Sequence, residues 1–154
     1  TGRTREAGCE SAGQSLWTPA AAARLTYLPS AVLTAGFAPV RPNVRAAGAG
    51  AYAGDIVTPT AEVLTFWVTL MGPHAGDRRV LVLRGPDGEP IARRQQSLTR
   101  DQARRFTFIG RRRPAEGWPR GCYVGEYRLV RAGELVHQTR RQVGIGDTCD
   151  APVE

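Results

Sequence analysis

The residues of this chain that could do chemistry are few and scattered. Ser11 lies in the stretch Cys9-Glu10-Ser11-Ala12-Gly13, whose second half matches the G-x-S-x-G motif that holds a nucleophilic serine. That motif needs a buried strand before it, and no apolar strand precedes Ser11. Its first glycine is also replaced by Cys9. We therefore assign no nucleophile here.

A second glycine-rich stretch, residues 48–53, matches the G-x-G-x-x-A pattern of dinucleotide-binding turns. Such a turn must open a helix whose N-terminus binds the pyrophosphate. The sequence continues instead into DIVTP at residues 55–59, which does not favour a helix. The match reflects an Ala- and Gly-rich composition, and we expect a flexible loop at residues 45–54 and no cofactor.

The two histidines and the carboxylates do not form a recognisable acid/base pair. His74 lies between Pro73 and Asp77 in a turn, where an exposed position is expected. His137 is expected on an inner strand face opposite Leu129, as a hydrogen-bonded core residue. The acidic residues have no spacing that forces two of them together. No catalytic residue is predicted, and a hydrolase with an unrecognised site is kept as an alternative.

Arginine supplies all twenty-one basic residues of the 154-residue chain, whose formal net charge is +7 and whose pI is near 10.3. Such a charge attracts polyanions, but a GC-rich coding sequence would also enrich arginine. One loop is dense enough to name as a binding site for acidic groups, because arginine pairs with carboxylate, sulfate and phosphate. Its residues are Arg111, Arg112, Arg113, Trp118 and Arg120. The alternative is that Trp118 covers one end of the fold while the arginines are solvated.

The elements that would position these residues are strands. The run VLTFWVTLM at Val63–Met71 alternates apolar side chains on one face and predicts a central strand, with Trp67 on the other face. Strands are also predicted at Arg79–Arg84 and Ile91–Gln95, joined by a Pro86-Asp87-Gly88 turn. Thr99 and Gln102 resemble a capping box, so a helical turn is predicted at residues 100–105 before a strand that contains Phe106 and Phe108.

The clearest strand pair is the hairpin that follows Trp118. Its two apolar sets share a face only if paired residue numbers sum to an even number. A three-residue loop, Ala132-Gly133-Glu134, meets this condition and places Tyr123 opposite Val143, whereas a two-residue loop does not. We therefore predict the three-residue loop.

Three cysteines, Cys9, Cys122 and Cys149, show no metal-binding or redox spacing, and the histidines are distant in sequence, so no metal site is predicted. In the hairpin register above, Cys149 can fold back to Cys122. A Cys9–Cys149 bond is the alternative. Either disulfide would indicate an oxidising compartment, periplasmic or extracellular, with a signal peptide already removed.

The first 61 residues are irregular in pattern, and residues 62–154 carry the regular strands. Within the first part, strands are expected at Leu25–Leu28 and Ser30–Phe37 and a helical turn at Pro19–Arg24. We expect this segment to pack on the strands, contribute strands to them and cover Trp67, so that the chain forms one domain. The longest apolar run is too short to cross a membrane.

Short antiparallel strands without a long amphipathic helix predict an all-β sandwich. The run Trp118-Pro119-Arg120-Gly121-Cys122-Tyr123, followed by the hairpin, resembles the last two strands of bacterial extracytoplasmic immunoglobulin-like domains, although that pattern does not require Cys122. The resemblance implies a noncatalytic binding or accessory module with a protein or acidic glycan partner. A polyanion-binding protein is the alternative, with nucleic acid the less favoured ligand. The sequence does not indicate an oligomeric state.

Overall fold

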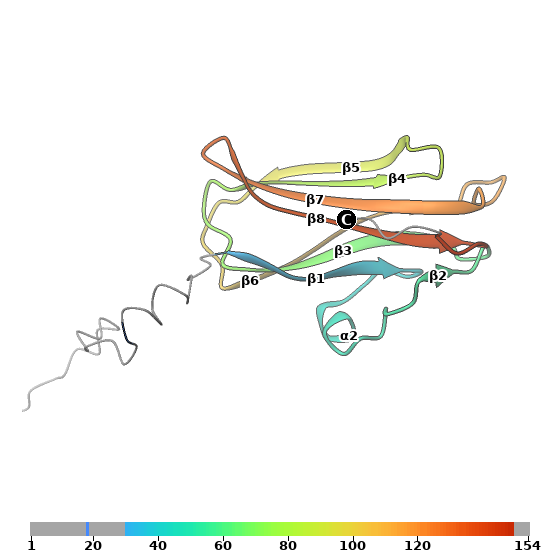
Figure 1. Ribbon diagram of the computed structural model, residues 1–154, viewed down its shortest axis with the longest axis horizontal. Coiled ribbons are helices and arrows are strands. Elements are labelled where there is room, and N and C mark those ends of the chain that lie inside the picture. Colours follow the sequence, from blue (N-terminus) through green and yellow to red (C-terminus); the bar gives the residue numbers. More distant parts are fainter. Residues whose placement is uncertain (1–17, 19–29, 150–154) are drawn as a thin grey trace, which may run out of the picture.

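The computed structural model describes residue 18 and residues 30–149, which form two packed antiparallel sheets (Figure 1). The three-stranded sheet has the order β1 (Ala31–Ala38), β3 (Val63–Met71), β6 (Arg104–Arg112). The five-stranded sheet has the order β2 (Ile56–Val57), β8 (Glu134–Ile145), β7 (Gly121–Arg131), β4 (Arg78–Arg84), β5 (Pro90–Ser97). Only the short β2–β8 pair is parallel. The all-β sandwich predicted from the sequence is thus confirmed.

The core lies between the two sheets and follows the alternation of β3. Leu64, Phe66, Val68 and Leu70 are buried against the inner faces of β4, β7 and β8. Gly125 on β7 leaves room for the Phe66 ring, because a Cβ at Gly125 would lie 2.2 Å from Phe66 Cδ2. The predicted central strand is correct in its bounds and in its inward face.

The β7–β8 hairpin has the predicted register but not the predicted loop. Tyr123 lies opposite Val143, as the pattern requires. Arg131 pairs directly with Glu134, however, so the turn contains only Ala132 and Gly133, both with positive φ. A bulge between Leu129 and Val130 shifts the register by one residue and brings the apolar sets back to one face. The expected three-residue loop is therefore wrong, and the bulge supplies the missing residue.

A disulfide joins Cys122 to Cys149, with a Cα–Cα distance of 5.3 Å. Cys149 reaches it because the chain reverses after β8 at Gly146, which has a φ of 75°. The Arg120 guanidinium donates to the Gly146 carbonyl at 2.7 Å and pairs with Asp147 at 3.1 Å, which holds the reversal. The alternative bond to Cys9 is excluded by this pairing, although Cys9 itself lies outside the described residues.

Two segments differ from the predictions. Residues 98–103 form bends rather than a helical turn, and Arg104 and Arg105 already belong to β6. The Gln102 N–H donates to the Pro73 carbonyl, and this tertiary contact replaces a capping box.

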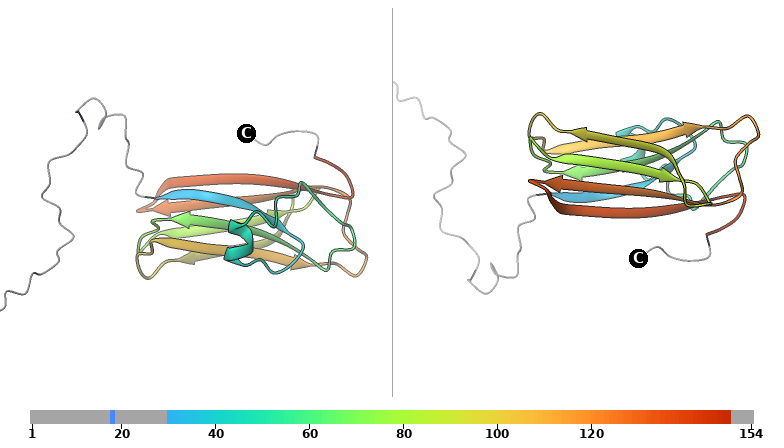
Figure 2. Two further views of the ribbon diagram at one scale, coloured as in Figure 1. Left: turned by 90° about the horizontal axis from the view of Figure 1, so that it is seen from below. Right: turned by 90° about the horizontal axis from the view of Figure 1, so that it is seen from above.

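The loop expected at residues 45–54 begins instead with a short helix, α2 (Val44–Gly48), whose first turn is capped by Asn43 Oδ1 at 2.8 Å from the Ala46 N–H. This helix and the loop after it cover the outer face of the three-stranded sheet (Figure 2, left). Trp67 is buried there between Ala38, Ala47 and Tyr52, as expected. The predicted helical turn at Pro19–Arg24 and the strand at Leu25–Leu28 lie outside the described residues.

Candidate functional site

Trp118, predicted to belong to the arginine-rich binding site, is buried at one end of the sandwich. Its indole N–H donates to the Ala61 carbonyl at 2.7 Å, and its ring meets Tyr123 edge to face. The stretch that carries Trp118 thus leads into β7 and covers the core. Its main surface is occupied by protein rather than open to a ligand.

The four arginines of the same prediction point in different directions. Arg113 donates to the Thr60 carbonyl at 2.8 Å, and Arg120 is engaged with Asp147. Arg111 and Arg112, by contrast, line a groove on the outside of the sandwich. The structure therefore does not bring the five predicted residues together, and two of them belong to a different surface.

This groove has a volume of about 810 Å³ and lies along β6 and the start of β3. Its floor follows the antiparallel register of these two strands, in which Val63 pairs with Arg112 and Thr65 with Gly110. Gly110 allows Thr65 to pack closely against β6, since a Cβ there would lie 2.5 Å from Thr65 Cγ2 and 2.9 Å from the Leu64 carbonyl oxygen.

The chain that leaves β1 forms one wall of the groove. Thr65 Oγ1 lies within 2.9 Å of the carbonyls of both Ala38 and Val40, which fixes the course of the segment as it leaves β1. Arg41 follows immediately, and its guanidinium lies 5.7 Å from the centre of the Phe108 ring. This cation–π contact presents a guanidinium and an aromatic edge to the same hollow.

The opposite wall comes from the gap between β5 and β6. Arg111 on β6 donates to the Ile91 carbonyl at 3.0 Å, and Arg94 on β5 lies 3.5 Å from the Phe108 carbonyl. Both contacts are to neutral backbone groups, so both arginines keep their charge uncompensated. Their side chains cross the gap in opposite directions.

The groove is consequently a concentration of positive charge. Arg41, Arg94, Arg111 and Arg112 line it with a single carboxylate, Glu62. Within residues 30–149, none of these four arginines has a carboxylate oxygen within 4.0 Å. Guanidinium groups that are exposed and unpaired can bind carboxylate or sulfate oxygens in bidentate fashion.

Three groove residues were missed in the sequence: Arg41, Arg94 and Phe108. The alternation Phe106, Phe108, Gly110, Arg112 on one face of β6 carries a signal for Phe108 and Arg112. Nothing in the sequence indicates that Arg41 would come to lie over that face, because this depends on the tertiary contacts of Thr65.

A smaller hollow of about 310 Å³ lies at the end of the sandwich between Arg111 and the edge of Trp118. It also contains Asp87 and Glu116. These carboxylates offset the charge of Arg111, so this hollow is less suited to an acidic ligand than the groove.

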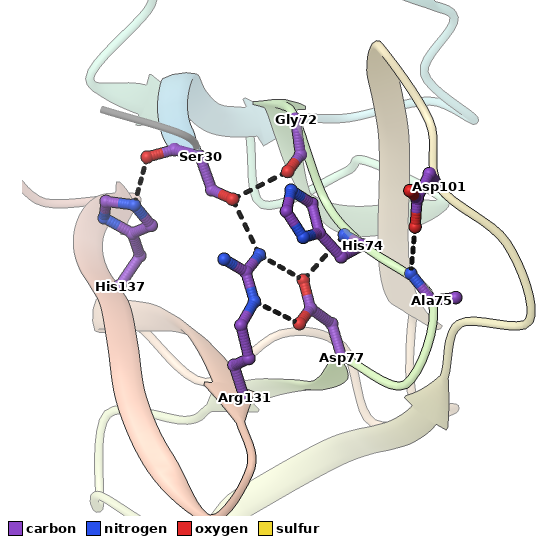
Figure 3. Close-up of polar contacts among 8 residues, drawn as sticks. All are labelled: Ser30, Gly72, His74, Ala75, Asp77, Asp101, Arg131 and His137. Atoms are coloured by element: carbon purple, nitrogen blue, oxygen red, sulfur yellow. Dashed lines mark hydrogen bonds and ion pairs between the residues drawn. The ribbon is translucent and has the colours of Figure 1, made fainter. Parts of the chain in front are cut away.

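A polar cluster at the opposite end of the sandwich contains both histidines (Figure 3). Asp77 is fully buried, and its carboxylate accepts from Arg131 at 2.7 and 2.8 Å and from the His74 backbone N–H at 2.8 Å. Burial alone would raise the pKa of Asp77, but the hydrogen bond from Arg131 and the other contacts outweigh it and lower the pKa. The Asp77 hydrogen bond raises the pKa of Arg131 in turn.

Ser30 joins this cluster without the geometry of a nucleophile. Its hydroxyl donates to the Gly72 carbonyl at 2.6 Å and accepts from Arg131 at 2.8 Å. His137 contacts the Ser30 carbonyl rather than its hydroxyl, and the His74 side chain is exposed (Figure 3). His137 does lie opposite Leu129, as predicted, and is half-buried. The cluster ties the start of β1, the β3–β4 loop and the β7–β8 hairpin together.

The described residues contain neither a metal-binding cluster nor a membrane-spanning helix. No group of three or more His, Cys, Asp or Glu side chains there is arranged to hold a metal ion. No helix in that part of the chain is long and apolar enough to cross a membrane.

Comparison with known proteins gives only distant likenesses. No protein-family profile matches the chain, and no curated protein matches it. Among solved structures, a β-glucuronidase from Parabacteroides merdae matches with a TM-score of 0.47 and 7% identity, over 76% of this chain and 13% of its own. A β-glucuronidase from Bifidobacterium dentium complexed with coumarin-3-O-glucuronide gives 0.43 and 15%, over 75% and 17%.

A putative β-galactosidase from Bacteroides fragilis gives a TM-score of 0.38 and 14% identity, over 53% of this chain and 14% of its own. The chain thus spans less than a fifth of the length of each of these structures. Likenesses at these scores say nothing of a shared activity.

Proposed function

We propose that this domain is a noncatalytic binding module whose arginine-lined groove takes the acidic groups of a ligand outside the cytoplasm. The observation that carries the proposal is the convergence of Arg41, Arg94, Arg111 and Arg112 from three segments of the chain, without a carboxylate partner, around the edge of Phe108. A surface that only kept the domain soluble would not need these groups gathered in one hollow.

We favour an acidic glycan over an extended polyanion as the ligand of this groove. The hollow, with a volume of about 810 Å³, has room for a sugar ring, and Phe108 offers an apolar edge beside the cationic groups. Carboxylate or sulfate substituents of the sugar would pair with the surrounding guanidinium groups. The Cys122–Cys149 disulfide supports a periplasmic or extracellular location, where such glycans occur.

Retention on a heparin column, followed by titration with sulfated and uronic-acid oligosaccharides, tests the proposal. The variant Arg41→Ser/Arg112→Ser removes two groove charges, and Arg100→Ser/Arg128→Ser removes two exposed charges elsewhere. Exposed charged contacts contribute up to about 1 kcal/mol each, so the groove variant should bind an acidic oligosaccharide about tenfold more weakly. The matched control should change little.

The proposal fails if both double variants lose affinity equally, because net charge alone would then explain retention. It also fails if the unmodified domain binds none of the acidic oligosaccharides at low salt. Binding that weakens steeply with added salt in the unmodified domain, and less steeply in the groove variant, is the expected pattern.

A further inference from the structure

A second cationic cluster lies inside the sandwich, away from the groove floor. Arg79 is on the inward face of β4, only 2% exposed, and is one of the largest fully buried side chains. Its one hydrogen-bond partner among the described residues is the neutral Oε1 of Gln96, directly opposite on β5. The Nε and the other terminal nitrogen of Arg79 are buried without a partner.

Two other donors beside Arg79 are in the same condition. The Tyr127 hydroxyl and the Arg105 Nε are both buried and have no partner in the described part of the chain. Tyr127 pairs with Leu81, two residues along β4 from Arg79 on the same face. Burial raises the pKa of Tyr127, so its hydroxyl keeps the proton that it can donate. Burial, followed by the charge of Arg105, lowers the pKa of Arg79.

The described residues offer this cluster no uncompensated negative charge. Asp77 is two residues before Arg79 in sequence, but its two oxygens are occupied by Arg131 and the His74 N–H. Asp77 and Arg131 therefore compensate one another and leave Arg79 and Arg105 in excess. Neither of these two forms an ion pair with any residue in the described ranges.

A buried, unpaired guanidinium is among the most unfavourable groups that a fold can contain. A buried lysine can relieve the cost by losing its proton, whereas a guanidinium does not deprotonate in proteins. Gln102 Oε1, the other buried acceptor without a partner in residues 30–149, is neutral and cannot balance the charge. The cost is relieved most directly by an anion that accepts from several of these donors at once.

We propose that Arg79, Arg105 and Tyr127 form an internal binding site for a small inorganic anion of the size of chloride. Their unpaired N–H and O–H groups, supplied by β4, β6 and β7, are all donors. The near-complete burial of Arg79 excludes a large ligand, whereas Arg105 is half-buried and lies nearer the solvent. The anion links the two sheets where they carry like charges. This site is independent of the groove and of its proposed ligand.

Thermal unfolding at constant ionic strength tests this proposal, with sodium gluconate replaced stepwise by sodium chloride. Because chloride would bind only the folded state, the midpoint should rise with chloride concentration and reach an increase of at least about 3 °C. Line broadening of the ³⁵Cl resonance by the native protein provides a direct second measurement, and it should disappear when bromide is added in excess.

Variants locate the effect. Arg79→Met and Tyr127→Phe remove the central donors while retaining bulk, and both should reduce the chloride-dependent rise and the ³⁵Cl broadening at least severalfold. Arg78→Met, the exposed neighbour on β4, removes the same charge and should keep both signals. If Arg79→Met does not fold, the chloride response of Tyr127→Phe alone tests the proposed site.

The proposal is overturned if chloride and gluconate give the same midpoint and no broadening is seen. It is also overturned if Arg78→Met loses the chloride response to the same extent as Tyr127→Phe, because the response would then follow net charge and not this cluster.

Discussion

Removal of the Cys122–Cys149 disulfide by the double substitution Cys122→Ser/Cys149→Ser should destabilise the domain strongly. The two cysteines are separated by 27 positions, and the loop that they close contains the β7–β8 hairpin from Cys122 onward. In the chain-entropy account, closing a loop of that length in the unfolded chain is worth about 3.5 kcal/mol. With an unfolding entropy of about 2.1 cal/mol/K per residue over roughly 120 ordered residues, the unfolding midpoint should fall by about 14 °C.

The assay is thermal unfolding followed by circular dichroism under nonreducing conditions. Both cysteines are replaced together, since a single substitution would leave one thiol free to pair with Cys9. The matched control is Cys9→Ser, which should leave the midpoint unchanged because the Cys122–Cys149 bond remains. A decrease of less than about 4 °C in the double variant, equivalent to about 1 kcal/mol, would refute the argument. Such a small decrease would mean that the β7–β8 hairpin stays largely ordered when the rest of the domain is unfolded, so that the disulfide restricts the unfolded chain little.

Two further predictions concern the cluster at Asp77 and the core at Gly125. Asp77→Asn should cost about 2–3 kcal/mol, less than a fully buried pair because the Arg131 side chain is 28% exposed. Since folding lowers the Asp77 pKa, this contribution is present above the unfolded value near about 3.9 and is lost as the pH falls through the folded value. The difference between the native domain and Asp77→Asn in urea unfolding should therefore shrink below about pH 4, and a difference unchanged at pH 2 would contradict it. Gly125→Ala places a Cβ 2.2 Å from Phe66 Cδ2 and should cost about 1–3 kcal/mol by the same measurement. Gly54→Ala, where the nearest atom is 3.7 Å away, should cost little, and equal effects would argue against a packing cause.

The strand pattern and the disulfide could be predicted because each depends on information that is local in sequence. The alternation of β3 fixes its inward face, and the parity of the β7–β8 pairing fixes which residues lie opposite one another. This parity requires one residue more than a two-residue turn supplies, but it does not specify where in the hairpin that residue lies. A wider loop and a bulge satisfy it equally, and the structure uses the bulge.

The groove that we propose as a binding site could be predicted only in part. Arg111 and Arg112 were identified from their density, but the residues that complete the groove come from positions 41 and 94. Trp118 was identified from its proximity to arginine in sequence, whereas the Ala61 carbonyl that receives its N–H is 57 positions away. The burial of Arg79 could not be predicted, because both faces of β4 carry apolar residues, valines on one and leucines on the other, so the pattern does not show which face meets the core.

The crossing of Arg94 and Arg111 between β5 and β6 has a consequence for the behaviour of the domain in crowded solution. Both strands are at the edge of their sheets, where open backbone groups can recruit a strand from another molecule. Each arginine reaches a carbonyl of the other edge, at Ile91 and at Phe108. An incoming chain would have to displace these contacts and approach a dense positive field. The side chains that line the proposed binding groove are thus also expected to oppose self-association through this side of the sandwich.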